Sequence, residues 1–163
     1  MKINIHEVCP RDGFQSMPSF DKDTKVRIIN RLVECGFHEL EVTSFVSPRA
    51  VPQLQDADEV IKEIDRNQPV ILRALVPNER GLERAHALGI KKVKLMLSGS
   101  DSHSLYNANA NTFDALERYR SVAEKALTYN MKMTGSIAVA FGCLMKEKYQ
   151  LNAMKKSVQS MHN

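Results

Sequence analysis

The feature that most constrains this chain is a regular alternation between short apolar runs and amphipathic helical segments. Residues 21–36 show the helical type, with Ile29 and Val33 on one face and a glycine as the stop signal. Strands are predicted at 3–8, 38–45, 69–76, 91–97 and 131–142, and helices at 21–36, 54–65, 78–89 and 112–130. Strands that are joined through helices run parallel in one sheet, so an α/β fold is expected.

An internal repetition narrows the choice among parallel folds. The stretches "ECGFHELEV" and "ALGIKKVKL" share a helix end, a glycine, a two-residue link and an alternating strand, as recurring βα units would. No G-x-G-x-x-G follows the first strand, so the signature of a dinucleotide-binding sheet is missing. A closed barrel typically takes about 250 residues. Because this chain has 163 residues, we predict a partial TIM (β/α)8 barrel with about five of its eight strands.

The charge and hydropathy patterns exclude two classes of partner. The net charge is +4, but four lysines and one acid follow Cys143, which leaves only +1 on residues 1–143. No apolar run approaches the roughly 18 residues that a membrane span needs, and no signal or transit peptide is recognised. We therefore expect neither a nucleic-acid partner nor a membrane partner.

The cysteines indicate a reducing compartment. Cys9, Cys35 and Cys143 are odd in number and have no Cys-x-x-Cys spacing, so neither a disulfide framework nor a zinc site is indicated. We expect a cytoplasmic protein in which these residues are small buried hydrophobes.

Polar side chains gather at the carboxyl ends of the predicted strands, where ligands bind in parallel βα folds. Asp12 offers a hard oxygen ligand for Mg²⁺ or Mn²⁺, and Arg11 offers a fixed fork of donors for a carboxylate, a thioester oxygen or an enolate. Glu41 could orient Arg11 or move a proton. The three groups are Arg11, Asp12 and Gln15 after the first strand; Glu41, Thr43 and Ser44 at the end of the second; and Ser98, Ser100, Asp101 and His103 after the fourth.

Simpler interpretations of these residues stand beside the functional one. Arg-Asp-Gly is a common turn in which Gly13 would supply a positive φ, and the charged pair could be an exposed salt bridge of small value. His6 and His38 fit packing or surface positions, and His103 fits a solvated polar loop. The convergence of three polar groups on one face favours a site.

Three stretches carry a resemblance to a known family. "EVCPRDGFQ", "LVECGFHELEVTSFVSPRAVPQLQDADEV" and "LVPNERGLERAHALGIKKV" closely resemble the 3-hydroxy-3-methylglutaryl-CoA lyase family of metal-dependent TIM-barrel lyases. The stretch "TSFVSPRAVPQ" separates these lyases from the related Claisen-type synthases. By this resemblance, residues 1–143 are the N-terminal part of a lyase barrel.

The resemblance implies a chemistry and a role for each site residue. Asp12 would bind the divalent cation, and Arg11 would bind substrate and stabilise the enolate of acetyl-CoA. Glu41 would be a catalytic carboxylate, while Gln15 and Ser44 would line the substrate pocket. The implied reaction is a retro-aldol cleavage of hydroxymethylglutaryl-CoA, an acyl-CoA, to acetyl-CoA and acetoacetate.

Two features set this chain apart from the family. Met17 and Pro18 replace a Glu-Lys pair of the mitochondrial-type lyases, which leaves open a lyase for a related 3-hydroxyacyl-CoA. The family's later metal ligands, a His-x-His pair and an asparagine, do not occur here, nor does the cysteine loop that supplies an acid. With Asp12 as its one ligand, Mg²⁺ or Mn²⁺ would be weakly held.

Residues 144–163 read as an out-of-frame tail. In the family, the cysteine of "FGC" begins the motif Cys-Pro-Tyr-Glu-Gly-Glu-Ile-Ser or a close variant. When the codons from Met145 to Gln150 are read one base earlier, they encode five successive residues. The first can only be Glu, the second Gly or Arg, the third Glu or Lys, the fourth Ile or Val, and the fifth Ser or Pro. These choices include Glu-Gly-Glu-Ile-Ser, the end of the family motif. The alternative is a native amphipathic terminal helix.

We expect the chain alone to have little lyase activity, or to be a non-enzymatic remnant. It should form homo-oligomers or aggregates through its open sheet edges. Apolar residues of "VILRALV" and "KVKLML" would face a barrel centre that this chain alone does not fill.

Overall fold

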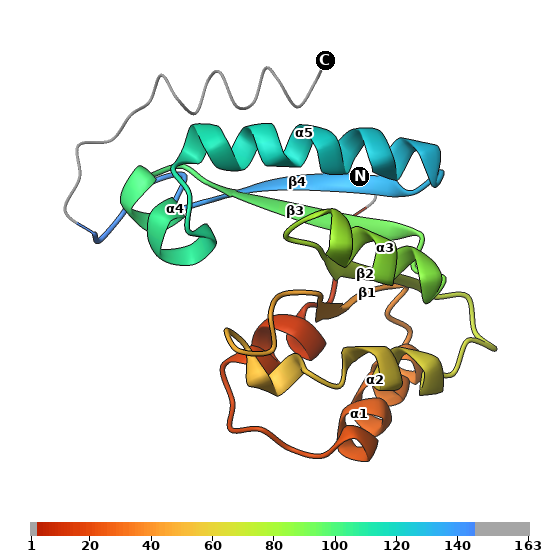
Figure 1. Cartoon of the computed structure of the whole chain (residues 1–163). Coiled ribbons are helices and arrows are strands. Elements are labelled where there is room, and N and C mark those ends of the chain that lie inside the picture. The colour runs from red at the N-terminus through yellow and green to blue at the C-terminus, as the bar shows by residue number, and fades with distance from the viewer. Residues whose placement is uncertain (1–2, 146–163) are drawn as a thin grey trace.

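Four parallel strands, paired in their order along the chain, form the sheet (Figure 1). The computed structural model describes residues 3–145. This arrangement of neighbouring βα units confirms the α/β fold class. The strands are β1 (Glu39–Ser44), β2 (Ile71–Leu75), β3 (Lys92–Ser98) and β4 (Lys132–Ala138).

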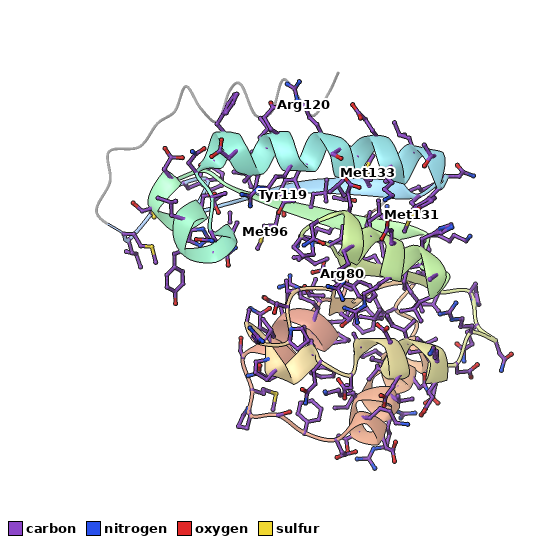
Figure 2. All side chains as sticks on the ribbon, in the orientation of Figure 1. Arg80, Met96, Tyr119, Arg120, Met131 and Met133 are labelled. Carbon is purple, nitrogen blue, oxygen red and sulfur yellow. The ribbon has the colours of Figure 1, made fainter. Side chains whose placement is uncertain are left out.

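Helices cover one face of this sheet (Figure 1). Buried side chains of β1, β2 and β3 pack against apolar residues of α1, α2, α3 and α5 in one continuous core. Figure 2 shows Tyr119 between α5 and β3, where its hydroxyl donates to the Met96 carbonyl at 3.0 Å. The helical elements are η1 (Cys9–Gly13, a π-helical turn), α1 (Lys22–Glu34), η2 (Pro52–Leu54), α2 (Ala57–Glu63), α3 (Glu79–Ala87), α4 (Asp101–Ala108) and α5 (Thr112–Thr128). No helix within residues 3–145 is long and apolar enough to cross a membrane.

Local signals explain the ends of α1. The Asp21 side chain accepts a hydrogen bond from the Thr24 N–H at 2.8 Å and caps the first turn. Gly36 has φ +89 after the last turn, a conformation that glycine adopts without steric cost. Ile29 and Val33 are buried against the sheet, and each contributes roughly 1.5–3 kcal/mol by leaving water.

The first predicted strand is largely wrong. Within residues 3–8 the described structure has one isolated bridge, in which the Glu7 N–H donates to the Glu39 carbonyl at 3.0 Å and the Glu41 N–H donates to the Glu7 carbonyl at 2.8 Å. Ile3 and Ile5 remain exposed. Alternation gives a segment strand character, but a ladder also needs a partner in register along its whole length.

Two other expectations need correction. The polar loop around His103 is the helix α4, which begins at the cap Ser100 and buries only Ser104, so it has no apolar stripe to reveal it. The cysteines are not buried hydrophobes, because Cys9 and Cys35 are exposed and Cys143 is half-buried. Cys35 caps the end of α1, where the chain turns away from the core.

The two faces of the sheet differ in character. Leu40, Leu72, Val93 and their alternate neighbours pack against the helices. Of the apolar residues in "VILRALV", Ile71 and Leu75 alternate with them on the opposite face, which is the face predicted to line the barrel centre. The opposite face carries charged residues in the intervening positions. These are Glu39 and Glu41 of β1, Arg73 of β2, and Lys92 and Lys94 of β3.

Candidate functional site

The turn η1 places Arg11 against the carboxyl end of the sheet. The N–H groups of Arg11 and Asp12 both donate to the Val8 carbonyl, at 3.0 and 2.8 Å, so the chain turns sharply one residue after the bridge at Glu7. Gly13 does not have a positive φ, and the predicted Arg-Asp-Gly turn is replaced by this π-helical turn. A Cβ on Gly13 would come within 3.2 Å of the Cys9 sulfur, so close packing explains the glycine.

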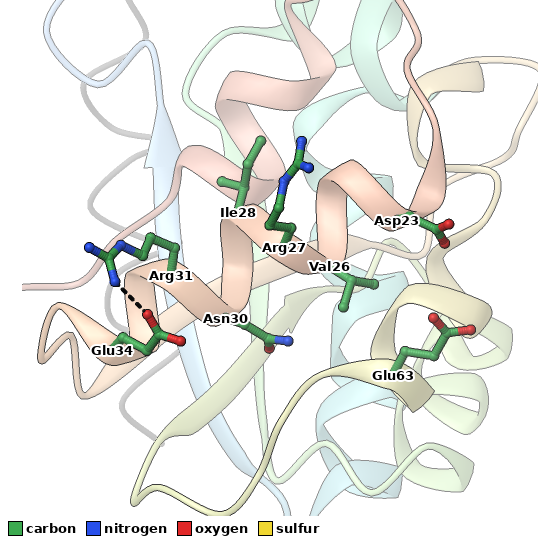
Figure 3. A pocket seen from close by; sticks show the side chains of 8 residues that line it. All are labelled: Asp23, Val26, Arg27, Ile28, Asn30, Arg31, Glu34 and Glu63. Carbon is green, nitrogen blue, oxygen red and sulfur yellow. Dashed lines mark hydrogen bonds and ion pairs between the residues drawn. The ribbon is translucent and has the colours of Figure 1, made fainter.

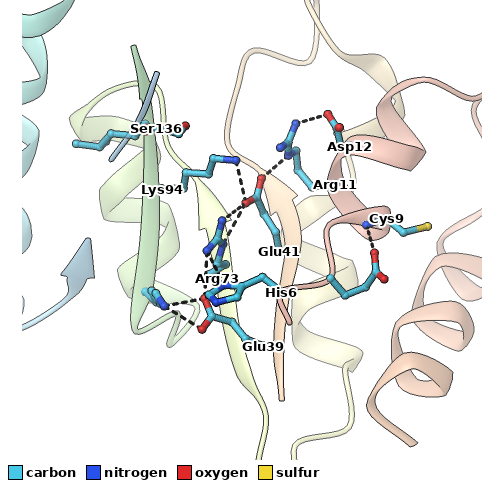
Figure 4. Close-up of polar contacts among 12 residues, drawn as sticks. His6, Cys9, Arg11, Asp12, Glu39, Glu41, Arg73, Lys94 and Ser136 are labelled. Carbon is cyan, nitrogen blue, oxygen red and sulfur yellow. Dashed lines mark hydrogen bonds and ion pairs between the residues drawn. The ribbon is translucent and has the colours of Figure 1, made fainter. Parts of the chain in front are cut away.

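A buried carboxylate holds the Arg11 side chain in place. Glu41 has no exposed surface, and its Oε1 accepts a hydrogen bond from Arg11 Nε at 2.5 Å (Figure 4). Its Oε2 accepts from Arg73 Nη2 at 2.7 Å and from Arg73 Nε at 3.1 Å. Both oxygens of Glu41 are therefore committed to guanidinium groups.

Electrostatics keep Glu41 ionised. Burial by itself would raise the pKa of Glu41, but the hydrogen bonds from Arg73 and the charges of Arg11 and Lys94 outweigh it, so the pKa lies below the usual range. Lys94 Nζ lies 3.4 Å from Oε2. A carboxylate with a lowered pKa is a weak base, so this geometry suits Glu41 to orienting Arg11 better than to moving a proton.

Asp12 is the exposed member of the group. Its Oδ1 accepts from Arg11 Nη1 at 2.6 Å, and its side chain is 62% exposed. A metal ion at this carboxylate would need further ligands, because residues 3–145 contain no cluster of three or more His, Cys, Asp or Glu side chains that could hold one. The described part of the chain thus fits a divalent cation only partially, through one hard oxygen ligand.

The end of β1 presents two buried hydroxyl groups. The register of β1 against β2 shifts between Glu41 and Thr43, an irregularity that can re-aim side chains near a site. Thr43 and Ser44 are buried, and their hydroxyl oxygens have no hydrogen-bond partner among the described residues. An unsatisfied buried hydroxyl costs about 1–3 kcal/mol, which a bound ligand could recover.

The other predicted residues lie outside this network. Gln15 is exposed just after η1, and among the described residues no hydrogen bond joins its side chain to Glu41, whose oxygens bind Arg11 and Arg73. His103 Nδ1 lies 2.8 Å from the Ser98 hydroxyl, where α4 follows β3. His103 is therefore paired with a buried serine, not solvated in a loop.

Sequence reasoning missed the cations that share the site. Arg73 Nη1 donates to Glu39 Oε1 at 3.1 Å, and Lys92 Nζ lies 2.7 Å from the same oxygen. His6 Nδ1 lies 2.9 Å from it as well. The available signal was the single charge in the apolar run "VILRALV", because an arginine in a buried strand requires a partner.

A surface hollow elsewhere does not belong to the site. It lies along the outside of α1, beside the end of α2, and contains none of the predicted site residues (Figure 3). Its rim includes the ion pair between Arg31 and Glu34 at 2.7 Å. The lining residues are Asp23, Val26, Arg27, Ile28, Asn30, Arg31, Glu34 and Glu63.

Comparisons with known proteins agree with the fold and the motifs. The family model described as HMGL-like matches residues 2–163. The chain is 39% identical over 143 residues to hydroxymethylglutaryl-CoA lyase YngG of Bacillus subtilis, covering 87% of this chain and 48% of that protein. It is also 39% identical over 142 residues to the mitochondrial hydroxymethylglutaryl-CoA lyase of Arabidopsis thaliana, covering 86% of this chain and 30% of that protein.

Solved structures of lyases share the architecture. The Bacillus subtilis HMG-CoA lyase superposes with a TM-score of 0.94 at 34% identity, covering 99% of this chain and 54% of that one. The Acinetobacter baumannii HMG-CoA lyase, solved with coenzyme A and 3-methylmalate, superposes with a TM-score of 0.88 at 33% identity, covering 96% and 51%. This chain spans about half the length of these proteins or less. The match of the family model over nearly the whole chain shows that this protein belongs to the HMGL-like family, as its motifs predicted.

Proposed function

We propose that this chain carries the N-terminal half of an active site that cleaves 3-hydroxy-3-methylglutaryl-CoA to acetyl-CoA and acetoacetate. The observation that carries this proposal is the Arg11 guanidinium, which is buried, held by Glu41 at 2.5 Å and placed next to Asp12. The relatives at 39% identity are named as lyases for this substrate. Such a reaction is a step of leucine degradation.

Arg11 would act on the charge that develops during cleavage. A retro-aldol step leaves the acetyl-CoA fragment as an enolate, with negative charge on the thioester oxygen. A guanidinium that is already fixed in a buried position can stabilise this oxygen without reorganising. Glu41 would serve catalysis by fixing Arg11, because both of its oxygens are occupied and its pKa is lowered.

Asp12 would hold the divalent cation, Mg²⁺ or Mn²⁺. When bound, such a cation polarises the tertiary hydroxyl of the substrate as a Lewis acid. One exposed carboxylate binds it weakly, so tight binding requires ligands beyond residues 3–145. The orphan hydroxyl groups of Thr43 and Ser44 would contact the acyl portion, and Gln15 would line the entrance.

A related 3-hydroxyacyl-CoA is the second candidate substrate. A relative from Pseudomonas aeruginosa, 36% identical over 143 residues, is named as a 3-hydroxy-3-isohexenylglutaryl-CoA and hydroxymethylglutaryl-CoA lyase. Met17 and Pro18 follow η1 in exposed positions, so a change there can alter acyl-CoA contacts without disturbing the core.

The cysteines bear on the compartment in which the protein would act. The exposed free thiols of Cys9 and Cys35 fit a reducing, cytoplasmic setting.

The tail is part of the same proposal. Residues 146–163 lie outside the described residues, and we propose that 144–163 are out of frame. Inserting one base near codon 144 of the DNA should then restore a reading frame that continues for more than about 100 codons, given the usual barrel length. Stop codons close downstream in both alternative frames of the DNA would contradict this.

An acetoacetate assay tests the function. The 163-residue protein and the frame-repaired protein are each incubated with Mg²⁺ or Mn²⁺ and hydroxymethylglutaryl-CoA. We expect metal-dependent acetoacetate release from the repaired protein and little from the shorter one. Cleavage of the isohexenyl substrate alone would favour the second candidate, and cleavage of neither would refute the lyase proposal.

A further inference from the structure

We propose that Arg73 is a positioning residue that fixes the Glu41 carboxylate and, through it, the guanidinium of Arg11. The inference rests on the proposed function, because it assigns a role within the same site. Arg73 and Glu41 are register partners on the neighbouring strands β2 and β1. Their side chains lie on the sheet face opposite the helices (Figure 4).

The hydrogen-bond geometry divides the carboxylate between two arginines. Arg73 directs Nε and Nη2 at Oε2 of Glu41, at 3.1 and 2.7 Å, while Arg11 Nε uses Oε1 at 2.5 Å. A carboxylate that is gripped at both oxygens cannot rotate about its last torsion without breaking one of the contacts. The planar fork of arginine gives this restraint, which a point charge such as lysine does not.

Arg73 is itself held from its other side. Its Nη1 donates to Glu39 Oε1 at 3.1 Å and lies 3.1 Å from His6 Nδ1. Lys92 Nζ holds Glu39 in turn, at 2.7 Å from Oε1. A continuous chain of contacts therefore runs across three strands and ends at Arg11, which lies in η1 outside the sheet.

Burial makes this support necessary. Glu41 has no exposed surface, so water cannot replace a lost partner. The charged groups that face it are Arg11 from η1, Arg73 from β2 and Lys94 from β3, and Lys94 stands off at 3.4 Å. Without Arg73, burial would drive the pKa of Glu41 upward, and a protonated Glu41 would lose its ionic hold on Arg11.

Nuclear magnetic resonance of the full 163-residue chain can test this without substrate. With ¹⁵N-arginine labelling, the Nε–H signal of Arg11, assigned by its loss in Arg11→Lys, should exchange slowly with water. In Arg73→Met this exchange should accelerate at least about tenfold, the loss expected for a hydrogen bond to a charged group. Arg31→Met is the control, because Arg31 pairs with the exposed Glu34 on α1, outside this chain of contacts, and it should leave the Arg11 signal unchanged.

Two further measurements guard against misfolding of the Met variant. Arg73→Lys keeps the charge but not the fork, so a folded Lys variant should also show accelerated exchange at Arg11. In the unmodified protein, the Nε–H signals of Arg11 and Arg73 should lose protection in one common transition as the pH falls, because both bind Glu41. The other titratable neighbours of the two arginines are Asp12, Glu39 and His6, and they contact the Nη1 nitrogens and not the Nε–H groups that are observed. The Nε–H signals of Arg11 and Arg73 should therefore still change together in a single transition.

The outcomes separate this inference from the proposed function. Unchanged Arg11 exchange in a folded Arg73 variant, or two separate acid transitions in the unmodified protein, would overturn the role of Arg73. Neither result bears on whether the repaired protein cleaves hydroxymethylglutaryl-CoA. Failure to release acetoacetate would conversely leave the exchange data standing.

Discussion

The two faces of the same four strands follow opposite rules. On the helix side, Leu40 and Val42 are fully packed among apolar side chains, and the hydrophobic effect sets their contribution. On the other side, Glu39 and Glu41, which alternate with them, lie in a chain of ion pairs with Arg73 and Lys92.

The difference teaches that a period of two lets one strand serve stability and chemistry separately. Substitutions on the helix side should change the free energy of unfolding and leave the arginine geometry alone. Substitutions on the charged side should do most of their damage to the site. Four experiments can break or sharpen this division.

The largest effect should come from Arg11→Met in the frame-repaired protein. Removing a preorganised donor to a developing oxyanion costs about 10²–10³ in turnover, with a smaller change in substrate affinity. Steady-state acetoacetate kinetics measure both. Arg31→Met, an exposed arginine on α1, is the control and should retain turnover. Lost affinity with normal turnover would make Arg11 a ground-state anchor.

The next effect concerns the helix-facing side. Leu40→Ala removes a fully buried side chain from the core and should lower the free energy of unfolding by about 2–5 kcal/mol. Urea titration of the 163-residue chain measures this loss. Ile71→Ala lies on the neighbouring strand, where the side chain is 49% exposed, and should cost much less. Equal losses would show that the apolar side is not packed as described.

The pH dependence tests the charged side. Because the pKa of Glu41 is lower in the folded chain than in the unfolded chain, its ionised form stabilises the fold above the unfolded pKa. This contribution is lost as the pH falls through the folded pKa.

Glu41→Gln should therefore be less stable than the unmodified protein at pH 7, and the gap should narrow in acid. Urea midpoints at pH 7, 5, 4 and 3 follow it, with Glu34→Gln on the exposed end of α1 as control. A gap that stays constant with pH would contradict the ionised state of Glu41.

The smallest effect should come from a half-exposed ion pair between helices. Arg84 contacts Asp58 at 2.6 Å and lies over the Phe45 ring at 4.9 Å. Arg84→Met keeps most of the packing and should cost about 0.5–1 kcal/mol, as expected for an exposed cation over an aromatic ring. Urea midpoints at low and high salt measure it. A loss as large as that of Leu40→Ala would show that this surface charge contributes as much as a buried core side chain.

Local sequence determined the elements that depend on neighbouring residues. The helix α1 follows from its cap Asp21 and its apolar stripe. The strands β1, β2 and β4 fall within the predicted segments, and β3 extends one residue beyond its segment. The rule that ligands gather at carboxyl ends of parallel strands placed Arg11, Asp12 and Glu41 near one another. These predictions succeed because periodicity, capping and strand order are written within a few residues of each other.

Only the tertiary structure decided which groups meet. Arg73 lies 32 positions from Glu41, and its contact depends on the register of β1 against β2. The single bridge at Glu7 and the exposure of the cysteines likewise depend on what packs beside them. A side chain's face follows from local alternation, but its partner follows from the pairing of distant strands, which local patterns do not encode.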